Sequence, residues 1–178
     1  MDFRARIRVA EHTDASAVAR IGSAAMSAQY IGLVDPEAVR AAVRQTYSVE
    51  SIADCIERCR SADAAEFLVA ERDGNVEGFL HFDSFGPEPE LHRLYVDGEA
   101  RSAGLGSRLM EALNDRLPES VRYMLLVVEG NDRAVAFYQR HGLQVAEQVD
   151  GLVYYRERMG VDFPASTRPF RLVLMRQV

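Results

Sequence analysis

Residues 101 to 106, Arg-Ser-Ala-Gly-Leu-Gly, could bind a phosphate group through backbone N–H groups. They lie between a segment with strand-like alternation, 90–96, and leucines that repeat every four residues as in an amphipathic helix. Gly104 and Gly106 lack Cβ atoms where a ligand could approach the backbone, and the N–H groups of a helix N-terminus point to the same place. The pattern predicts an anion cradle suited to a diphosphate.

Three phosphate-binding designs compete for this loop. A P-loop requires a Gly-Lys pair, which the chain does not contain. A dinucleotide-binding fingerprint requires a third glycine where Leu109 stands, and it usually opens the first βαβ unit of a fold. The remaining design is an Arg/Gln-x-x-Gly-x-Gly/Ala loop, which Arg101 to Gly106 match.

A second motif lies downstream. Residues 121–128 are apolar and rich in β-formers, as in a buried strand, and residues 131–142 follow the spacing Asn-x-x-Ala-x-x-Phe-Tyr-x-x-x-Gly. Asn131 suits a helix N-cap, and Gly142 suits the position after the helix end. In order and separation the two motifs resemble those of the GCN5-related N-acetyltransferase (GNAT) family, over about the C-terminal half of the chain.

Other segments predict the elements that must position these motifs. Helices are expected to begin near Thr13-Asp14, Asp35-Pro36 and Ser48, and the leucine stripe predicts a further helix from Leu105 to Leu117. Strands are expected at 4–10, 67–71, 76–85, 90–96, 121–128, 144–149, 152–156 and 170–176. With the resemblance, this order predicts one α/β (α+β) domain over residues 1–178. Its sheet should be mixed, mostly antiparallel and twisted, with about seven strands and helices on both faces.

Composition excludes several classes of protein. The 178 residues suit one domain, and 48% hydrophobic with 27% charged residues is ordinary for a globular chain. No apolar run approaches the ~20 residues of a membrane span, and the N-terminus lacks the apolar core of a signal peptide, so a cytoplasmic protein is expected. The net charge of −6 argues against a nucleic-acid surface.

Cys55 and Cys59 lie four residues apart in the helix expected after Ser48, and therefore on one face of it. A zinc site would need further ligands, and no second Cys or His cluster supplies them. The histidines at 12, 81, 92 and 141 form no ligand pair at a diagnostic spacing. Reduced, partly buried thiols are therefore favoured over metal or redox chemistry, and no metal is expected.

The resemblance implies three catalytic residues. Acetyl transfer to an amine needs a base for the ammonium proton, a donor for the oxyanion and an acid for the departing thiolate. Glu90 is implied as the base, because it lies six residues before Val96, as the glutamate of the histone-acetylating branch does, with a solvated residue after a proline-rich turn as the alternative. His92 matches a relay histidine of the arylalkylamine branch, with packing in the cleft wall as an equal alternative. Tyr138 matches the tyrosine that meets the coenzyme sulfur, with an aromatic core contact as the alternative.

Strand alternation makes a geometric prediction for 90–96. Glu90 should share a face with His92, Leu94 and Val96, while Leu91, Arg93 and Tyr95 face the other way.

The resemblance also implies where acetyl-CoA binds. Main-chain groups of Leu94, Tyr95 and Val96 would meet the pantetheine arm in a sheet-like way. Backbone N–H groups from Arg101, Ser102, Ala103, Gly104, Leu105, Gly106 and Ser107 would hold the pyrophosphate, and Asn131, Ala134 and Tyr138 would complete the site. Ala103 replaces a basic residue frequent in the family.

The leading hypothesis is an acetyl-CoA-dependent N-acetyltransferase acting on a small primary amine. Residues 90–96 and the helix at 48–52 look most similar to the bacterial polyamine-acetylating branch, and Asp83, Glu88 and Glu90 could attract a polycation. The alternatives are a protein or peptide N-acetyltransferase and a non-catalytic acyl-CoA-binding module, against which Glu90 and Tyr138 argue. By resemblance, a homodimer is a further expectation, with neither nucleic acid nor membrane as a partner.

Overall fold

A computed structural model describes residues 5–32, 34–98, 104–161, 163, 165 and 167–177. The predictions made for Arg101, Ser102 and Ala103 lie outside these residues.

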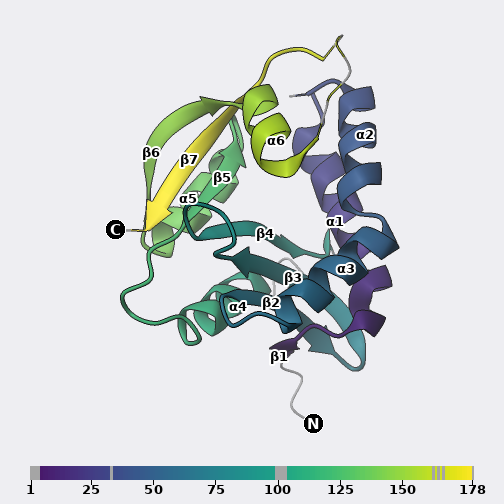
Figure 1. The fold of residues 1–178 in the computed structure, drawn as a ribbon, viewed down its shortest axis with the longest axis vertical. Coiled ribbons are helices and arrows are strands. Elements are labelled where there is room, and N and C mark those ends of the chain that lie inside the picture. Colours follow the sequence, from purple (N-terminus) through teal and green to yellow (C-terminus); the bar gives the residue numbers. More distant parts are fainter. Residues whose placement is uncertain are drawn as a thin grey trace.

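A seven-stranded sheet forms the centre of the molecule, in the order β1-β2-β3-β4-β5-β7-β6. Neighbouring strands are antiparallel except β4 and β5, which are parallel (Figure 1). The predicted mixed, mostly antiparallel sheet is therefore confirmed. The strands are β1 (Arg6–Val9), β2 (Ala65–Arg72), β3 (Asn75–Asp83), β4 (Glu90–Val96), β5 (Met124–Val128), β6 (Leu143–Asp150) and β7 (Arg171–Gln177).

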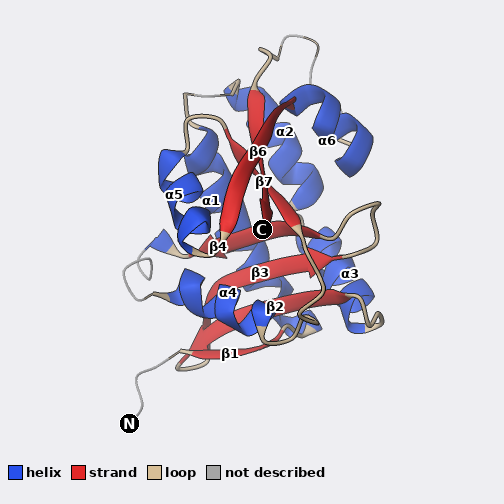
Figure 2. Cartoon of the chain, turned by 90° about the vertical axis from the view of Figure 1, so that its left-hand side faces the viewer, coloured by secondary structure: helices blue, strands red, loops and turns tan. Residues whose placement is uncertain are grey.

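Helices cover both faces of the sheet, as predicted (Figure 2). The first three pack on one face, where Phe67 and Phe79 meet Ile52 in one core cluster. Helix α4 covers the other face, where Leu109 meets Leu80 and Phe82, and α5 packs against this second cluster. The helices are α1 (Ala15–Tyr30), α2 (Pro36–Thr46), α3 (Val49–Arg60), α4 (Leu105–Asn114), α5 (Asp132–Arg140) and α6 (Gly151–Met159), with a short 3₁₀ turn at His12–Asp14. None of the described helices is long and apolar enough to cross a bilayer.

Side-chain caps fix three of the predicted helix starts. Asp35 accepts hydrogen bonds from the backbone N–H groups of Glu37 (2.9 Å) and Ala38 (3.2 Å) before α2. Ser48 accepts one from Ser51 before α3, and Asn131 accepts one from Ala134 before α5. Each cap satisfies N–H groups that have no partner inside the helix, which is why these residues were visible in the sequence as starts.

The strand predicted at 152–156 is wrong, because these residues belong to α6. Asp150 caps this helix by accepting from the N–H of Val153 (3.0 Å), and the Tyr155 hydroxyl lies 2.7 Å from the Tyr30 hydroxyl on α1. Aromatic and β-branched residues favoured a strand, but this cap and the packing against α1 outweigh that weak preference. Two further limits were misjudged: α4 ends at Asn114 rather than Leu117, and β5 begins at Met124 rather than residue 121.

Replacing Leu109 by alanine should lower the free energy of unfolding by about 2–5 kcal/mol, because the side chain is fully buried between α4 and the sheet and its loss leaves a cavity. Urea denaturation at an unchanged m-value would measure it. Val153→Ala removes a side chain that is 45% exposed and should change the stability by no more than about 0.5 kcal/mol. A similar loss in both variants would contradict the assignment of Leu109 to the core.

Candidate active site

The site begins where the two parallel strands separate. The register between β4 and β5 consists of the pair Glu90–Met124, next to a hydrogen bond from the N–H of Met124 to the carbonyl of Pro89 (3.0 Å). Beyond that pair the strands diverge (Figure 1). A cleft of about 550 Å³ lies between them, lined also by residues of α1, α5 and the start of α4. We call it the β4–β5 cleft. Where β4 faces this cleft, its backbone groups pair with no strand among the described residues, so a ligand could bond to them.

Most of the residues predicted to bind the cofactor meet at this cleft. Those that line it are Leu94, Tyr95, Val96, Gly104, Gly106, Ser107, Asn131, Ala134 and Tyr138. The side chain of Leu105 instead lies in the core, 1% exposed. The structure thus brings the two sequence motifs to one cavity, and the ligand contacts of the individual residues stay predictions.

The glycines at the start of α4 have separate structural reasons. Gly104 is the N-cap of α4 with a φ of +69°, a conformation that residues with a Cβ rarely adopt. A Cβ on Gly106 would lie 3.3 Å from Cζ of Phe137 on α5. The second glycine therefore allows α4 and α5 to approach each other closely at the cleft.

A second cavity, of about 720 Å³, lies between α3, α6 and the place where β3 ends and β4 begins. We call it the polar pocket. His92 and Arg93 line both cavities, and Glu90 lines the polar pocket beside them. The two cavities therefore meet at His92.

The predicted alternation along β4 is wrong at its start. Arg93 pairs with His81, and Leu91 pairs with Phe82, so His92 is an extra residue in β4, a β-bulge. As a result Leu91 shares the core cluster of Leu94, whereas His92 and Arg93 both reach the polar pocket. An inserted residue shifts the alternation, and no sequence pattern announced it.

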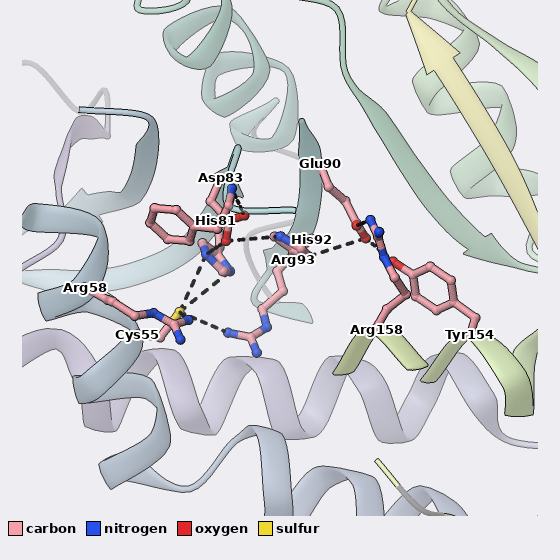
Figure 3. Close-up of polar contacts among 10 residues, drawn as sticks. Cys55, Arg58, His81, Asp83, Glu90, His92, Arg93, Tyr154 and Arg158 are labelled. Atoms are coloured by element: carbon pink, nitrogen blue, oxygen red, sulfur yellow. Dashed lines mark hydrogen bonds and ion pairs between the residues drawn. The ribbon is translucent and has the colours of Figure 1, made fainter. Parts of the chain in front are cut away.

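Glu90 is buried, 5% exposed, and closely surrounded (Figure 3). The Tyr154 hydroxyl donates a hydrogen bond to Oε1, and Nη2 of Arg158 donates one to Oε2 over 3.3 Å. Nδ1 of His92 lies 3.4 Å from Oε1. Burial opposes ionisation of this carboxyl, but the contacts with His92, Tyr154 and Arg158 outweigh it and hold the pKa of Glu90 below its ordinary value.

His92 lies between two carboxylates. Its Nε2 is 3.2 Å from Oδ2 of Asp83, without the alignment of a hydrogen bond, and its ring stacks on His81 at 4.9 Å between centroids. Burial disfavours the charged ring, yet Asp83 and Glu90 together raise the pKa of His92 to about 9. Burial raises the pKa of Asp83, but the contacts with His81 and His92 outweigh it and hold that pKa below its usual range. His92 is therefore an imidazolium at neutral pH.

Tyr138 lies on α5 in the wall of the β4–β5 cleft, with its ring edge-on to Phe137 at 5.1 Å. Burial raises its pKa well above the ordinary value for a tyrosine. The hydroxyl therefore keeps its proton at neutral pH, as a proton donor must.

No spacing in the sequence linked a cysteine to a histidine, but the structure brings Cys55 beside His81. Sγ of Cys55 lies 3.6 Å from Nε2 of His81 and 3.8 Å from Nη1 of Arg93 (Figure 3). A hydrogen bond from Cys59 lowers the pKa of Cys55, and, against the effect of burial, His81 and Arg93 lower it further. In the described part of the chain, two groups of three ligand-type side chains have donor atoms within 4.8 Å of one another, Cys55–Cys59–His81 and His81–Asp83–His92.

Sequence reasoning did not single out four residues of the site, which are Tyr154, Arg158, Arg93 and His81. Tyr154 and Arg158 come from α6, part of which was expected to be a strand. The face of β4 that Arg93 occupies depends on the bulge. No local signal could have found them.

Comparison with known proteins agrees with this geometry. The acetyltransferase (GNAT) family matches residues 35–143, and the chain belongs to this family and is an N-acetyltransferase. It is 27% identical over 131 residues to the spermidine N(1)-acetyltransferase of Thermoplasma acidophilum, covering 72% of this chain and 81% of that protein. It is 26% identical over 113 residues to the spermine/spermidine N(1)-acetyltransferase of Bacillus subtilis, covering 57% and 74%.

Among solved structures, the PaiA N-acetyltransferase of Thermoplasma acidophilum in complex with coenzyme A has a TM-score of 0.75 at 22% identity, covering 97% of this chain and 98% of that one. At this identity the likeness supports the fold.

Tyr154→Phe and Arg158→Gln should each raise the pKa of Glu90 toward its ordinary value, because each removes a donor that stabilises the carboxylate. Carbon NMR titration of labelled glutamate side chains would measure the shift. Arg176→Gln is the matched control, since Arg176 pairs with the neighbouring Glu88 and should leave the pKa of Glu90 unchanged. An unshifted Glu90 in both test variants would contradict the described contacts.

Proposed function

We propose that the protein transfers the acetyl group of acetyl-CoA to a primary amine of a small molecule, with polyamines as the favoured class. The amine attacks the thioester directly, Glu90 takes the amine proton and Tyr138 protonates the departing thiolate. The observation that carries this proposal is that the β4–β5 cleft and the polar pocket meet at His92, beside Glu90.

The cleft suits acetyl-CoA for two reasons. Backbone groups of Leu94 to Val96 border the opening between β4 and β5, where an extended pantetheine arm could bond to them as a strand would. At the far end, Gly104, Gly106 and Ser107 surround the N-terminus of α4, whose free N–H groups suit a pyrophosphate. An N–H of β4 that faces the cleft is also the natural donor to the oxyanion.

Glu90 is suited to receive a positively charged amine. The carboxylate is ionised, and its contact with Arg158 is long, 3.3 Å, so an incoming ammonium could replace that guanidinium. His92, held between Glu90 and Asp83, fixes the orientation of the carboxylate and could relay the proton. The ammonium must first lose one proton to solvent, because only the neutral amine has the lone pair that attacks the thioester. Once the carbon–nitrogen bond has formed, that nitrogen is cationic and acidic, so the weakly basic Glu90 can take its second proton.

The polar pocket favours cationic acceptors by a small margin of charge. Its acidic residues are Asp54, Asp83, Glu88, Glu90 and Glu157, and its cationic residues are Arg58, Arg93, Arg158 and the protonated His92. A polyamine could place its distal ammonium groups against the acids beyond Glu90. The names of the Thermoplasma acidophilum and Bacillus subtilis relatives support the same class.

Glu90→Gln should lower kcat/KM by about 10² to 10⁴-fold, because the amine proton loses its acceptor, and Tyr138→Phe should lower it by about 10²-fold. Release of the coenzyme thiol measures the rate, and calorimetry should show acetyl-CoA binding unchanged in Glu90→Gln. Glu66→Gln is the matched control with full activity, because Glu66 pairs with Arg116 and lines neither cavity. Full activity in Glu90→Gln would refute its role as the base.

Spermidine and spermine should be acetylated with a higher kcat/KM than arylalkylamines, amino acids or short peptides, because they present several ammonium groups to the acidic pocket, and with a higher one than aminoglycosides, because their ammonium groups lie on a slender flexible chain rather than on bulky rings. Thiol release across such a panel measures this. A preference for peptides would favour a protein N-acetyltransferase, and silence with tight acetyl-CoA binding would favour a non-catalytic binding module.

A further inference from the structure

We propose that Cys55, Cys59 and His81 form a binding site for one thiophilic divalent cation, of which zinc is the best fit, in the wall of the polar pocket. The proposed ligands include neither Glu90 nor Tyr138, the residues proposed to carry acetyl transfer. The proposal rests on three ligand-type side chains that two elements, α3 and β3, bring close together.

The three donors already have nearly the spacing that a metal requires. Cys55 and Cys59 lie one turn apart on α3, and His81 reaches them from β3, so that all donor atoms fall within 4.8 Å of one another. In tetrahedral zinc sites, Zn–S bonds of about 2.3 Å and Zn–N bonds of about 2.0–2.1 Å put sulfur and nitrogen roughly 3.5 Å apart. Sγ of Cys55 lies 3.8 Å from Nδ1 of His81, the nitrogen that would bind the cation, and 3.6 Å from Nε2. A small adjustment of side chains would therefore complete the geometry.

Neighbouring residues resemble the outer shell of a metal site. Oδ2 of Asp83 lies 3.3 Å from Nε2 of His81, which leaves Nδ1 for the cation, and a carboxylate behind a ligating histidine is a common arrangement. Guanidinium groups of Arg93 and Arg58 lie 3.8 and 4.0 Å from Sγ of Cys55, where they favour the thiolate form that metals bind. Two thiolates would neutralise a divalent cation, so these arginines would face no net positive charge.

The choice of metal follows from the donors. Two sulfurs and one imidazole select zinc or a similar soft cation over magnesium, calcium or manganese. Cys55 and His81 line the polar pocket, whereas Cys59 does not, so the cation could enter from the pocket and keep an open position toward it. The overlapping group His81–Asp83–His92 is the weaker candidate, because it lacks sulfur and His92 is already held between two carboxylates.

Cobalt titration of the reduced, chelator-treated protein tests the proposal. One equivalent of Co²⁺ should give the visible bands of tetrahedral cobalt with thiolate charge-transfer bands, and zinc should displace it. Cys55→Ser, Cys59→Ser and His81→Gln should each weaken cobalt binding by at least about tenfold, with less charge transfer in the serine variants. His12→Gln and Asp54→Asn, an exposed histidine and a pocket acid outside the donor set, should match the wild type.

A second readout does not depend on the fold of any variant. Zinc should slow alkylation of both cysteines in the wild-type protein, followed by mass spectrometry, and should raise its melting temperature. Substoichiometric cobalt binding without charge transfer would overturn the proposal. So would full affinity in Cys59→Ser, which would move the cation to the histidine–aspartate group.

Discussion

The short pairing between β4 and β5 is the constraint on which the site depends. A continuous parallel ladder would satisfy the backbone of both strands and leave no room between them. Here the pairing is limited to Glu90 and Met124, and the strands then diverge. That divergence creates the β4–β5 cleft, leaves backbone groups of β4 available, and puts Glu90 at the vertex. Other elements fit around it: α4 and α5 close one side of the opening, and α1 closes the other.

A chain of buried polar groups crosses the molecule from α3 to α6 (Figure 3). It runs from Cys55 through His81, Asp83 and His92 to Glu90, and ends at Tyr154 and Arg158. Buried charges are tolerated when they are paired. If one partner is removed, the other stays buried without compensation for its lost hydration, which destabilises the protein. The polar pocket is therefore a coupled unit, in which the end at Glu90 and the end at the cysteines are linked through His81 and Asp83. A cation at the cysteines would act on the same residues that orient Glu90.

Local chemistry explains which elements could be predicted. The starts of α2, α3 and α5 follow from Asp35, Ser48 and Asn131, since a cap is satisfied within three residues of itself. The hairpin between β2 and β3 is also locally determined. Its turn needs positive φ values, which Asp73 and Gly74 adopt. The helix α6 was missed because its sequence favours a strand, and its contact with Tyr30 lies 125 residues away. A contact at that separation has no local pattern.

The sequence by itself determined the family and the class of fold, and it predicted a glycine-bearing anion cradle and the candidates Glu90, His92 and Tyr138, because motif spacing and helix caps are short-range properties. Only the tertiary structure decided how these residues are used. The bulge at His92 set which side chains of β4 reach the polar pocket, and α6 supplied Tyr154 and Arg158 to Glu90. The packing of α3 on β3 joined Cys55 and Cys59 to His81. Each of these depends on segments far apart in the chain packing together, so each is decided by the shape of the core rather than by neighbouring residues.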